Sequence, residues 1–589
     1  MCGIYGEIRT SGEVSPLGLA TATRSMQSRG PDAAGFFVQG SVGFGHRRLS
    51  ILDLSAASQQ PMIDNQLGLG IVFNGCIYNF RDLRTELSSK GYQFFSEGDT
   101  EVILKAYHAW GPGCVRKFKG MFAFAIWERD SGRVVIVRDR LGIKPLYYAE
   151  ADGSFRFAST LPALLAAGGI DATIDPISLH HFFSFHAAVP SPRTILKGVK
   201  KLAPGTWLII EPDGSRKSER YWSFAVGENP GDSTITQDEW AEAVSASVKE
   251  AVERRRVADV PVGVLLSGGL DSSLIVALLA ELGHDDIRTF SIGFESVGKH
   301  SGDEFQYSDL IARHFSTNHE QIRIDRGRAL EVLPAAIKAM SEPMVSHDSV
   351  AFYLLSEEVA KRVKVVQSGQ GADEVFGGYS WYPSFLSAND PAEQYEAAYF
   401  DWRHADLAKL LTKDLVSQDH SRKFVDDFFA RTPAGSPADK ALQIDTEIML
   451  VDDPVKRVDN MTMAFGLEAR VPFLDHEVVE LAARIPAHLK IGGGGKYILK
   501  QAARKFVPAE VIDRPKGYFP VPSLRYLNGP FLDYVRDVLG SRAARERGIY
   551  NPEFINHMLQ EPEAEMSPKG HSRLWQAALL EAWMQAHAV

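Results

Sequence analysis

Two groups of residues in this 589-residue chain have types and spacings suited to chemistry, and the first begins at the second position. Cys2 becomes the N-terminal residue once Met1 is removed, which places a thiol and a free α-amino group on one residue. Their ordinary pKa values lie within about one unit of each other, so the amine can take the thiol proton at little cost. Cys2 can then act as nucleophile and base together. The alternative is a small buried hydrophobic cysteine.

The second group is the glycine-rich string SGGLDSS at residues 267–273, which follows an apolar strand pattern and opens a helical one. Small residues at such a junction let backbone N–H groups and hydroxyls surround an anion at a helix N-terminus. The string lacks the lysine of a Walker loop. It predicts a site for a pyrophosphate-sized anion, with an ordinary Gly-Gly turn as the alternative.

The secondary-structure pattern around these residues differs between the first and second parts of the chain. Up to about residue 207, short β-type runs alternate with turns, and helical patterns occur at 81–90 and 100–110. Linker-like composition and a following helical pattern place a domain boundary between residues 210 and 236. Beyond it, strands, glycine-rich loops and helices alternate, which predicts βαβ units and a parallel sheet. From about Asp390 the pattern is mostly helical.

Composition limits the partners. The net charge is −10, with 64 Lys+Arg against 74 Asp+Glu, and no block of five like charges occurs, so neither nucleic acid nor an anionic membrane surface is expected to bind. The longest apolar runs fall short of the ~20 residues that span a bilayer, and the first residues do not read as a secretory signal. The three cysteines form neither a disulfide framework nor zinc-type spacing, which favours a reducing cytoplasm. Small molecules are the expected partners.

Six stretches of the first half resemble, in their order, the class II glutamine amidotransferases, which are N-terminal-nucleophile hydrolases. They are the N-terminal CGI, RGPDAAG at 29–35, GHRRLSILD at 45–53, FNGCIYN at 73–79, GDTEV at 98–102 and RDRLGIKPLYY at 138–148. The resemblance implies that Cys2 attacks the amide carbon of glutamine, with Asn74 and the backbone N–H of Gly75 as the oxyanion hole. Arg48 would hold the α-carboxylate of glutamine, and Asp99 its α-ammonium group.

The string SGGLDSS resembles the phosphate loop of the ATP pyrophosphatases, which split ATP into AMP and pyrophosphate. Joined to a class II glutaminase domain, it is similar to the glutamine-dependent asparagine synthetase family over essentially the whole chain. Further matches are TFSIGFE from 289, SGQGADEVFGGY from 368, LEARVPFLD from 467 and RPKGYFPVP from 514. The implied fold is a multidomain α/β protein. It has an αββα hydrolase domain at 2–215 and a parallel-sheet α/β domain with a helical tail at 236–589.

The resemblance also assigns residues in the second domain. Those expected to bind the pyrophosphate part of ATP are Ser267, Gly268, Gly269, Ser272 and Ser273. Those expected to meet adenosine are Leu265, Ile292, Ser368 and Gly369. Asp271 and Asp373, on loops at neighbouring strand ends, would hold Mg²⁺, with helix caps as the alternative role. Lys516 resembles the lysine that neutralises charge on the adenylation transition state.

Two positions depart from the family pattern. Cys76 stands where a glutamate commonly follows Asn-Gly, so a carboxylate contact to glutamine is missing. Gln370 stands where many asparagine synthetases have an acidic residue near the activated carboxylate. An amide can donate and accept hydrogen bonds but cannot accept a proton, so Gln370 is not assigned as a general base.

The expected reaction releases ammonia from glutamine, adenylates a carboxylate with ATP and displaces AMP with the ammonia, which the family moves through an intramolecular tunnel. Segments such as FFSEGDTEV look most like the N-acetylglutaminylglutamine amidotransferase branch, with aspartate as the alternative acceptor. A more remote alternative is an amidophosphoribosyltransferase, whose hydrophobic run ending in Asp-Asp is imitated by IMLVDDP at 448–454. Another is a catalytically degenerate binding module. The resemblance also allows for a homodimer.

Overall fold

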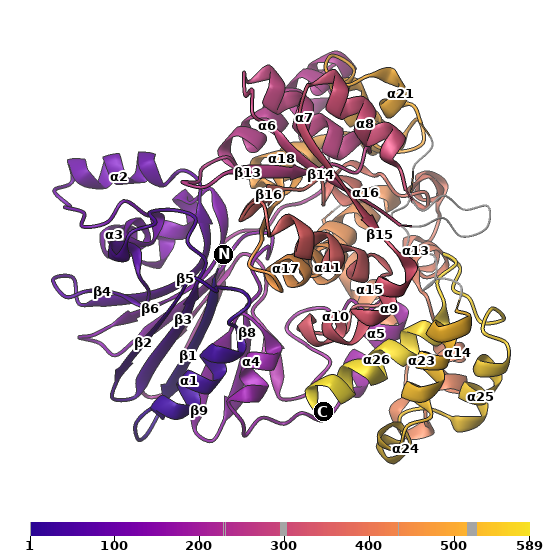
Figure 1. Ribbon diagram of the computed structural model, residues 1–589, viewed down its shortest axis with the longest axis horizontal. Coiled ribbons are helices and arrows are strands. Elements are labelled where there is room, and N and C mark those ends of the chain that lie inside the picture. The colour runs from indigo at the N-terminus through magenta and orange to yellow at the C-terminus, as the bar shows by residue number, and fades with distance from the viewer. Residues whose placement is uncertain are drawn as a thin grey trace.

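The computed structural model describes residues 2–589 except 228, 230, 295–302, 434, 515, 516 and 518–526, and except the side chain of Arg326. Figure 1 shows two units side by side. The N-terminal unit is rich in strands, and the C-terminal unit places helices around a central sheet.

Two six-stranded sheets form the N-terminal unit, and every described neighbouring pair of strands is antiparallel. The first sheet runs in the order β10 (Val199–Lys201), β8 (Tyr147–Ala151), β9 (Ser154–Ala158), β1 (Gly3–Arg9), β3 (Val42–Arg48) and β2 (Ala33–Gln39). The second runs in the order β12 (Arg216–Arg220), β11 (Thr206–Ile210), β7 (Val134–Arg138), β6 (Gly120–Glu128), β5 (Leu69–Ile77) and β4 (Met62–Asp64).

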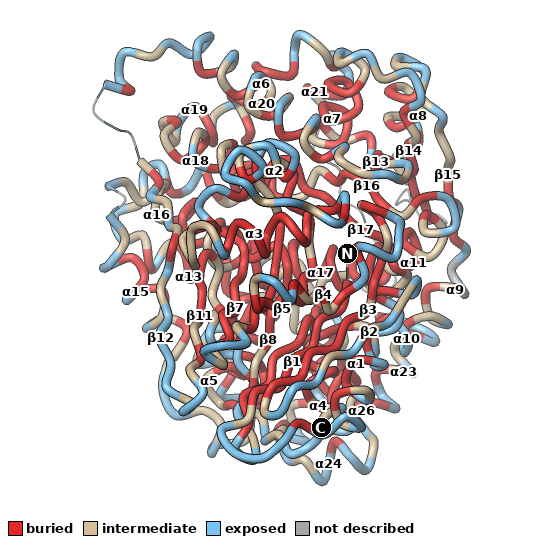
Figure 2. Tube along the Cα trace, turned by 90° about the vertical axis from the view of Figure 1, so that its left-hand side faces the viewer, coloured by how far each residue is buried: buried red, intermediate tan, exposed pale blue. Residues whose placement is uncertain are grey.

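The two sheets pack face to face, and helices cover their outer faces. Residues such as Ile4, Phe44, Val72 and Ala123 interdigitate between the sheets, as alternation along half-buried strands requires. Helices α1 (Pro16–Ser25) and α4 (Leu161–Ala166) contact the first sheet, and α2 (Phe80–Ser89) and α3 (Asp99–Trp110) pack beside the second. Helix α5 (Pro176–Ser184) follows α4 along the chain. The predicted αββα architecture is confirmed. Figure 2 shows the buried residues concentrated along the strands.

A five-stranded sheet lies at the centre of the C-terminal unit. Its order is β15 (Asn318–Ile324), β14 (Arg288–Phe294), β13 (Val262–Leu265), β16 (Val365–Gln367) and β17 (Glu468–Arg470), and all its described pairs are parallel. The predicted parallel sheet is therefore confirmed. The sequence patterns missed β17, which lies in the stretch with a mostly helical pattern.

Helices cover both faces of this sheet, as a parallel sheet requires. The helices described in the C-terminal unit are α6 (Gln237–Arg254), α7 (Leu270–Glu281), α8 (Phe305–His314), α9 (Arg326–Glu331), α10 (Leu333–Ala339), α11 (Asp348–Val359), α12 (Ala372–Phe376), α13 (Pro391–Tyr399), α14 (His404–Leu410), α15 (His420–Arg431), α16 (Pro437–Ile444), α17 (Lys456–Met463), α18 (His476–Arg484), α19 (Ala487–Ile491), α20 (Tyr497–Ala503), α21 (Ala509–Ile512), α23 (Gly529–Leu539), α24 (Arg542–Arg547), α25 (Pro552–Gln560) and α26 (Arg573–His587). Among them, α7, α8, α11 and α17 contact the strands of this sheet directly.

The first helix after the inter-domain segment begins at a strong local signal. Thr236 caps α6, and its side chain and that of Glu239 form a reciprocal capping box. None of the helices that the structure describes combines the length and apolar character needed to cross a membrane.

Candidate active sites

The first candidate site is a small pocket where the two antiparallel sheets of the N-terminal unit meet. Cys2 directly precedes β1, Arg48 ends β3, Gly75 lies in β5 and Asp99 begins α3, and all four line the pocket. Asn74, also in β5, is fully buried beside it. The five residues that the sequence assigns to glutamine therefore come together from four segments that only the folded sandwich joins.

Cys2 is held through both of its backbone polar groups. Its N–H donates to Oδ1 of Asn74 at 2.9 Å, and its carbonyl oxygen accepts from Nε of Arg29 at 3.3 Å. Burial raises the pKa of the Cys2 thiol above its usual value, although a hydrogen bond from the Leu49 backbone opposes this effect. The thiol is therefore neutral at neutral pH, and it needs a base before it can attack a carbonyl carbon.

The side-chain amide of Asn74 has a hydrogen-bond donor without a partner among the described residues, as an oxyanion hole requires before its substrate binds. Its Oδ1 is occupied by Cys2, while its Nδ2 is buried and has no hydrogen-bond partner among the described residues. A buried donor without a partner is costly unless a ligand satisfies it. Gly75 approaches β6 closely, because an added Cβ would lie 2.1 Å from the Met121 carbonyl oxygen. This position therefore excludes a side chain.

Arg48 lines the pocket with its guanidinium already oriented. Its Nη1 donates to the Ser55 carbonyl at 2.8 Å, and its Nη2 donates to the Asp53 carbonyl. Two of its five N–H groups are used in this way, so the planar fork is fixed before a carboxylate arrives. Asp99 is likewise oriented, because its Oδ2 accepts from the backbone N–H of Ile77 at 2.9 Å.

The role that the resemblance gives to Asp99, binding the α-ammonium group of glutamine, predicts a loss of activity at acidic pH. Burial raises the pKa of the Asp99 carboxyl to about 6, against the opposing hydrogen bond from Ile77. Because only the ionised form attracts an ammonium group, kcat/KM for glutamine should fall about tenfold per pH unit below pH 6. A pH profile of glutamine hydrolysis checks this. Asp99→Asn should lower kcat/KM and remove that acidic limb, and an unchanged limb in this variant would assign it to another group.

Two residues of this pocket come from the C-terminal unit and were missed by the sequence analysis. Glu468 and Arg470, both in β17, line it with Cys2 and Cys76. Both are almost completely buried, and Nε of Arg470 donates to Oε1 of Glu468 at 2.5 Å. Nη1 of Arg470 also donates to two backbone carbonyls that follow α6. A carboxylate from the second domain therefore lies beside the position where Cys76 replaces the expected glutamate.

The second candidate site is a cavity of about 550 Å³ at the carboxyl ends of β13, β14 and β16. The SGGLDSS turn lies between β13 and α7, and the Ser368–Gly369 turn follows β16, its neighbour in the sheet. The two turns touch, because a Cβ added at Gly369 would lie 2.8 Å from Cβ of Asp271. Both predicted loops thus face one cavity, at the position where such sheets bind ligands.

Most of the residues that the sequence assigns to ATP or its metal line this cavity. They are Leu265, Ser267, Gly269, Asp271, Ser272, Ile292, Ser368, Gly369 and Asp373. Gly268 and Ser273 do not line it. Gly268 has a φ of +72°, and an added Cβ would lie 2.6 Å from the Ser308 nitrogen, so its role is to let the turn pass α8. Ser273 is buried within α7.

Lys496 is a cavity residue that the sequence analysis did not single out. Its Nζ lies 2.6 Å from Oδ2 of Asp271 and 2.9 Å from Oδ1 of Asp373. Burial lowers the pKa of Lys496, but the two carboxylates outweigh it and raise the pKa above the usual value. The two carboxylates therefore converge on one cation, and hard oxygen donors of this kind also suit Mg²⁺. Lys516 lies outside the described residues.

Gln370 and Asp348 lie in the wall of the same cavity. Asp348 begins α11, and burial raises the pKa of its carboxyl, while the neighbouring Arg457 charge opposes this. The cavity wall therefore carries an amide at position 370, where an acidic side chain was the family's common residue, and a buried carboxyl at Asp348.

The two sites are joined by a continuous buried interface. Leu49, Ile51, Tyr78 and Met121 of the first domain belong to one apolar cluster with Val264, Leu266 and Val471 of the second.

Ion pairs also cross between the two domains. Lys201 Nζ contacts Asp452 at 2.5 Å and Glu342 at 3.1 Å. Asp452 belongs to the IMLVDDP run, which forms π-helical turns before α17. That run therefore makes an inter-domain ion pair and not the strand end of a phosphoribosyl site.

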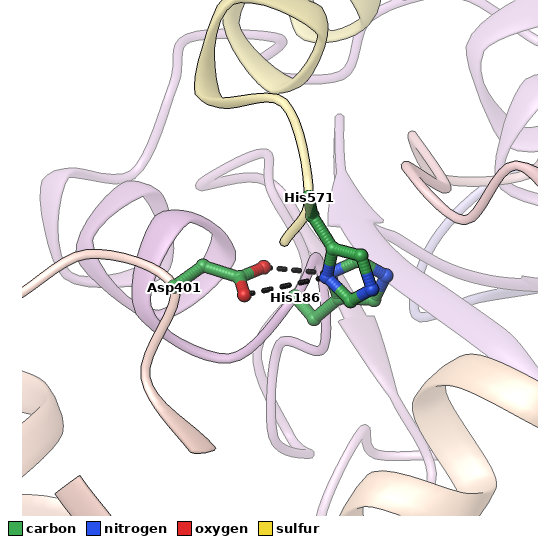
Figure 3. A group of neighbouring side chains, drawn as sticks. All are labelled: His186, Asp401 and His571. Carbon is green, nitrogen blue, oxygen red and sulfur yellow. Dashed lines mark hydrogen bonds and ion pairs between the residues drawn. The ribbon is translucent and has the colours of Figure 1, made fainter. Parts of the chain in front are cut away.

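A group of metal-ligand types lies elsewhere, where His186, Asp401 and His571 meet (Figure 3). His186 Nδ1 lies 2.6 Å from Asp401 Oδ2, and His571 Nδ1 lies 3.5 Å from Oδ1. The ammonium of Lys569 also lies 3.5 Å from Oδ1 of Asp401. Asp401 thus pairs with two imidazoles and one ammonium group, and we interpret this buried polar group as an anchor for the segment that precedes α26.

Known protein families match both halves of the chain. A model of the family described as asparagine synthase matches residues 243–585, and one described as glutamine amidotransferase domain matches residues 1–222. Asparagine synthetase [glutamine-hydrolyzing] 1 of Bacillus subtilis is 32% identical over 94% of this chain and 91% of its own length. Asparagine synthetase [glutamine-hydrolyzing] 3 of the same organism is 31% identical over 88% of this chain and 87% of its own length. Amidase chyE of Penicillium rubens is 25% identical, covering 92% of this chain and 90% of that protein.

Proposed function

Because this chain belongs to the glutamine-hydrolysing asparagine synthetase family, and is thus a ligase of the amidotransferase type, we propose that it works with two separate active sites. Residues 2–215 would form a glutaminase, and residues 236–589 would use ATP to turn a carboxylic acid into an amide. The observation that carries the proposal is the pair of preformed pockets, one around Cys2 and one around the SGGLDSS turn, in a single chain.

In the proposed glutaminase step, the sulfur of Cys2 attacks the amide carbon of glutamine. The α-amino group freed by loss of Met1 takes the thiol proton and delivers it to the departing ammonia. The negative oxygen that develops accepts from Nδ2 of Asn74 and from the N–H of Gly75. Water then releases glutamate from the thioester. The buried, unmatched amide of Asn74 supports this assignment.

In the proposed synthetase step, an acceptor carboxylate attacks the α-phosphorus of ATP, and pyrophosphate leaves. Ammonia then displaces AMP from the acyl-adenylate, which has a better leaving group than the free acid. Asp271 and Asp373 would hold Mg²⁺, which neutralises phosphate charge when bound. Lys496 contacts both carboxylates in the same cavity, where its ammonium group would neutralise phosphate charge. We propose it in the charge-neutralising role that sequence resemblance gives to Lys516.

Ammonia must travel between the two sites without taking up a proton or escaping. We propose that it moves through the inter-domain apolar cluster that includes Met121, Val471 and Leu266. An apolar route favours the neutral, nucleophilic form of ammonia, because charged ammonium is strongly disfavoured away from water.

For the acceptor we propose N-acetylglutaminylglutamine, with aspartate as the alternative. Gln370 supports this choice, since it presents an amide to the cavity in place of the acidic side chain found in many asparagine synthetases. An amide can donate to and accept from the peptide groups of a dipeptide. Relatives with other names, such as amidase chyE, align over most of the chain, so membership in the family does not fix the acceptor.

Offering the two acids separately tests the acceptor. With Mg-ATP and glutamine present, pyrophosphate should form with N-acetylglutaminylglutamine at least tenfold faster than with aspartate at equal concentration. The comparison variant is Gln370→Glu. Because it restores an acidic side chain, the ratio of the rate with N-acetylglutaminylglutamine to the rate with aspartate should be smaller in this variant. Pyrophosphate formed only with aspartate would refute the dipeptide assignment and leave the two-site account standing.

A further inference from the structure

Two buried cations of the first domain have no part in the reaction described above, although both lie in stretches that the sequence analysis singled out. Arg29 belongs to RGPDAAG, and Lys144 belongs to RDRLGIKPLYY. Both contact Asp459 of α17, in the second domain. Nη1 and Nη2 of Arg29 donate to the two carboxylate oxygens at 2.8 and 3.3 Å, and Nζ of Lys144 lies 3.4 Å from Oδ1.

The same guanidinium also reaches the nucleophile. Nε of Arg29 donates to the carbonyl oxygen of Cys2 at 3.3 Å. Arg29 is 3% exposed and Asp459 is 4% exposed, so water cannot substitute for either contact. Because the guanidinium is planar and rigid, fixing one edge on Asp459 fixes the direction of its Nε–H bond.

This contact matters because Cys2 is the terminal residue of the processed chain. Chain ends fray unless they are tied down. Of its two backbone anchors, one is Oδ1 of Asn74, which holds the nitrogen that must remain free to exchange protons. The other is Arg29, which holds the carbonyl and so limits rotation of the residue as a whole.

Helix α17 is also linked to the ATP cavity through a neighbouring helix. It packs against α11, whose first residue, Asp348, lines that cavity. Arg457, two residues before Asp459, pairs with Asp453 at 2.9 Å and is the principal positive charge acting on Asp348. One short helix thus carries Asp459, which reaches Cys2 through Arg29, and Arg457, whose charge acts on Asp348 of the ATP cavity.

We propose that Asp459 is a positioning residue for the glutaminase. Acting through Arg29, it fixes Cys2 in its reactive geometry, so that the synthetase domain holds the glutaminase nucleophile in place. This inference rests on the proposed role of Cys2 and extends it across the domain interface.

The test uses the full-length enzyme and two variants. Asp459→Asn removes the charge that holds Arg29. Arg29→Lys keeps a cation for Asp459 but lacks the fork needed to reach both partners, and it serves where the first variant does not fold. In each, kcat for glutamine hydrolysis should fall tenfold to ~100-fold, as expected when a reacting group is misplaced by about 1 Å. KM for glutamine should change less than about threefold, since Arg48 and Asp99 remain.

Two further readouts separate positioning from general instability. Amide formation from added ammonia should stay within about twofold of wild type. Alkylation of Cys2 by a chloroketone analogue of glutamine, followed by mass spectrometry, should slow by about the same factor as hydrolysis. The matched control is Asp452→Asn, which removes a buried inter-domain partner of Lys201 but does not touch the Cys2 contact. It should leave all three rates within about twofold.

Wild-type glutamine hydrolysis in both variants would overturn the inference, and so would an equal loss of the glutamine and ammonia reactions. If Cys2→Ala still uses glutamine, the glutaminase proposal itself fails. If Cys2→Ala loses glutamine use while Asp459→Asn and Arg29→Lys keep it, only the positioning role fails.

Discussion

Cys2→Ala should abolish glutamine-dependent amide formation, by more than 10³-fold, while leaving the ammonia-dependent reaction near its wild-type rate. The loss is large because the substitution removes the nucleophile itself, and the other thiol of the pocket, Cys76, lies within β5 and carries no free α-amino group to act as its base. The retained reaction follows because the ATP cavity contains no atom of Cys2. Glutamate release and pyrophosphate release, measured with glutamine and then with ammonium chloride, report the two activities separately.

Cys114→Ala is the matched control, since Cys114 is also buried but packs in the apolar cluster beneath α3. It should keep both activities, with any loss appearing in thermal stability. Continued glutamine use by Cys2→Ala would show that another group opens the amide bond. Equal loss of both nitrogen sources would show that Cys2 supports the structure and not one reaction.

Asp271→Asn and Asp373→Asn should each lower pyrophosphate formation by more than 10²-fold, or about 2.7 kcal/mol in the barrier, with glutamine hydrolysis retained. Either change removes one of the two carboxylates that contact Lys496 beside the proposed phosphate loop. The remaining carboxylate pairs with Lys496 alone, which weakens the site for a divalent cation. Pyrophosphate release, measured at several Mg²⁺ concentrations, checks both variants.

Asp286→Asn, an exposed acidic residue ahead of β14, should behave as wild type in the same assay. Normal pyrophosphate release by both cavity variants would remove these aspartates from the metal and phosphate site. A loss that higher Mg²⁺ concentrations partly restore would support the metal role.

The sequence predicts well those strands, loops and helices that have a local residue pattern. SGGLDSS follows β13 and opens α7, and the Ser368 turn follows β16, as the strand and loop patterns indicate. The local patterns alone did not make β13 and β16 neighbours; the family resemblance placed Asp271 and Asp373 at neighbouring strand ends, and the sheet order agrees with it. That adjacency depends on sheet order, a property of the whole domain.

The missed residues share a physical cause. β17 has only three residues, two of them charged, so it has no apolar run to indicate a strand. Glu468 and Arg470 are buried because they pair with each other and with the neighbouring backbone, not because their types favour burial. Their entry into the Cys2 pocket depends on how the two domains dock.

Lys496 illustrates the same limit in the second site. It follows four glycines and adopts a φ of +53°, and nothing local distinguishes it from a solvated lysine. Only the folded cavity shows that it contacts two carboxylates. The role of Asp459 could not be predicted from sequence either, because its partners Arg29 and Lys144 lie 430 and 315 residues away along the chain.

The central claim is that nitrogen leaves glutamine in one domain and joins an acid activated by ATP in the other. Glutamine labelled with ¹⁵N in its side-chain amide, supplied with Mg-ATP and N-acetylglutaminylglutamine, tests it most directly by mass spectrometry of the product. The account predicts ¹⁵N in a newly formed amide, with glutamate, AMP and pyrophosphate formed in equal amounts. ADP and phosphate as the nucleotide products, or glutamate and AMP without labelled amide from either this dipeptide or aspartate, would contradict it.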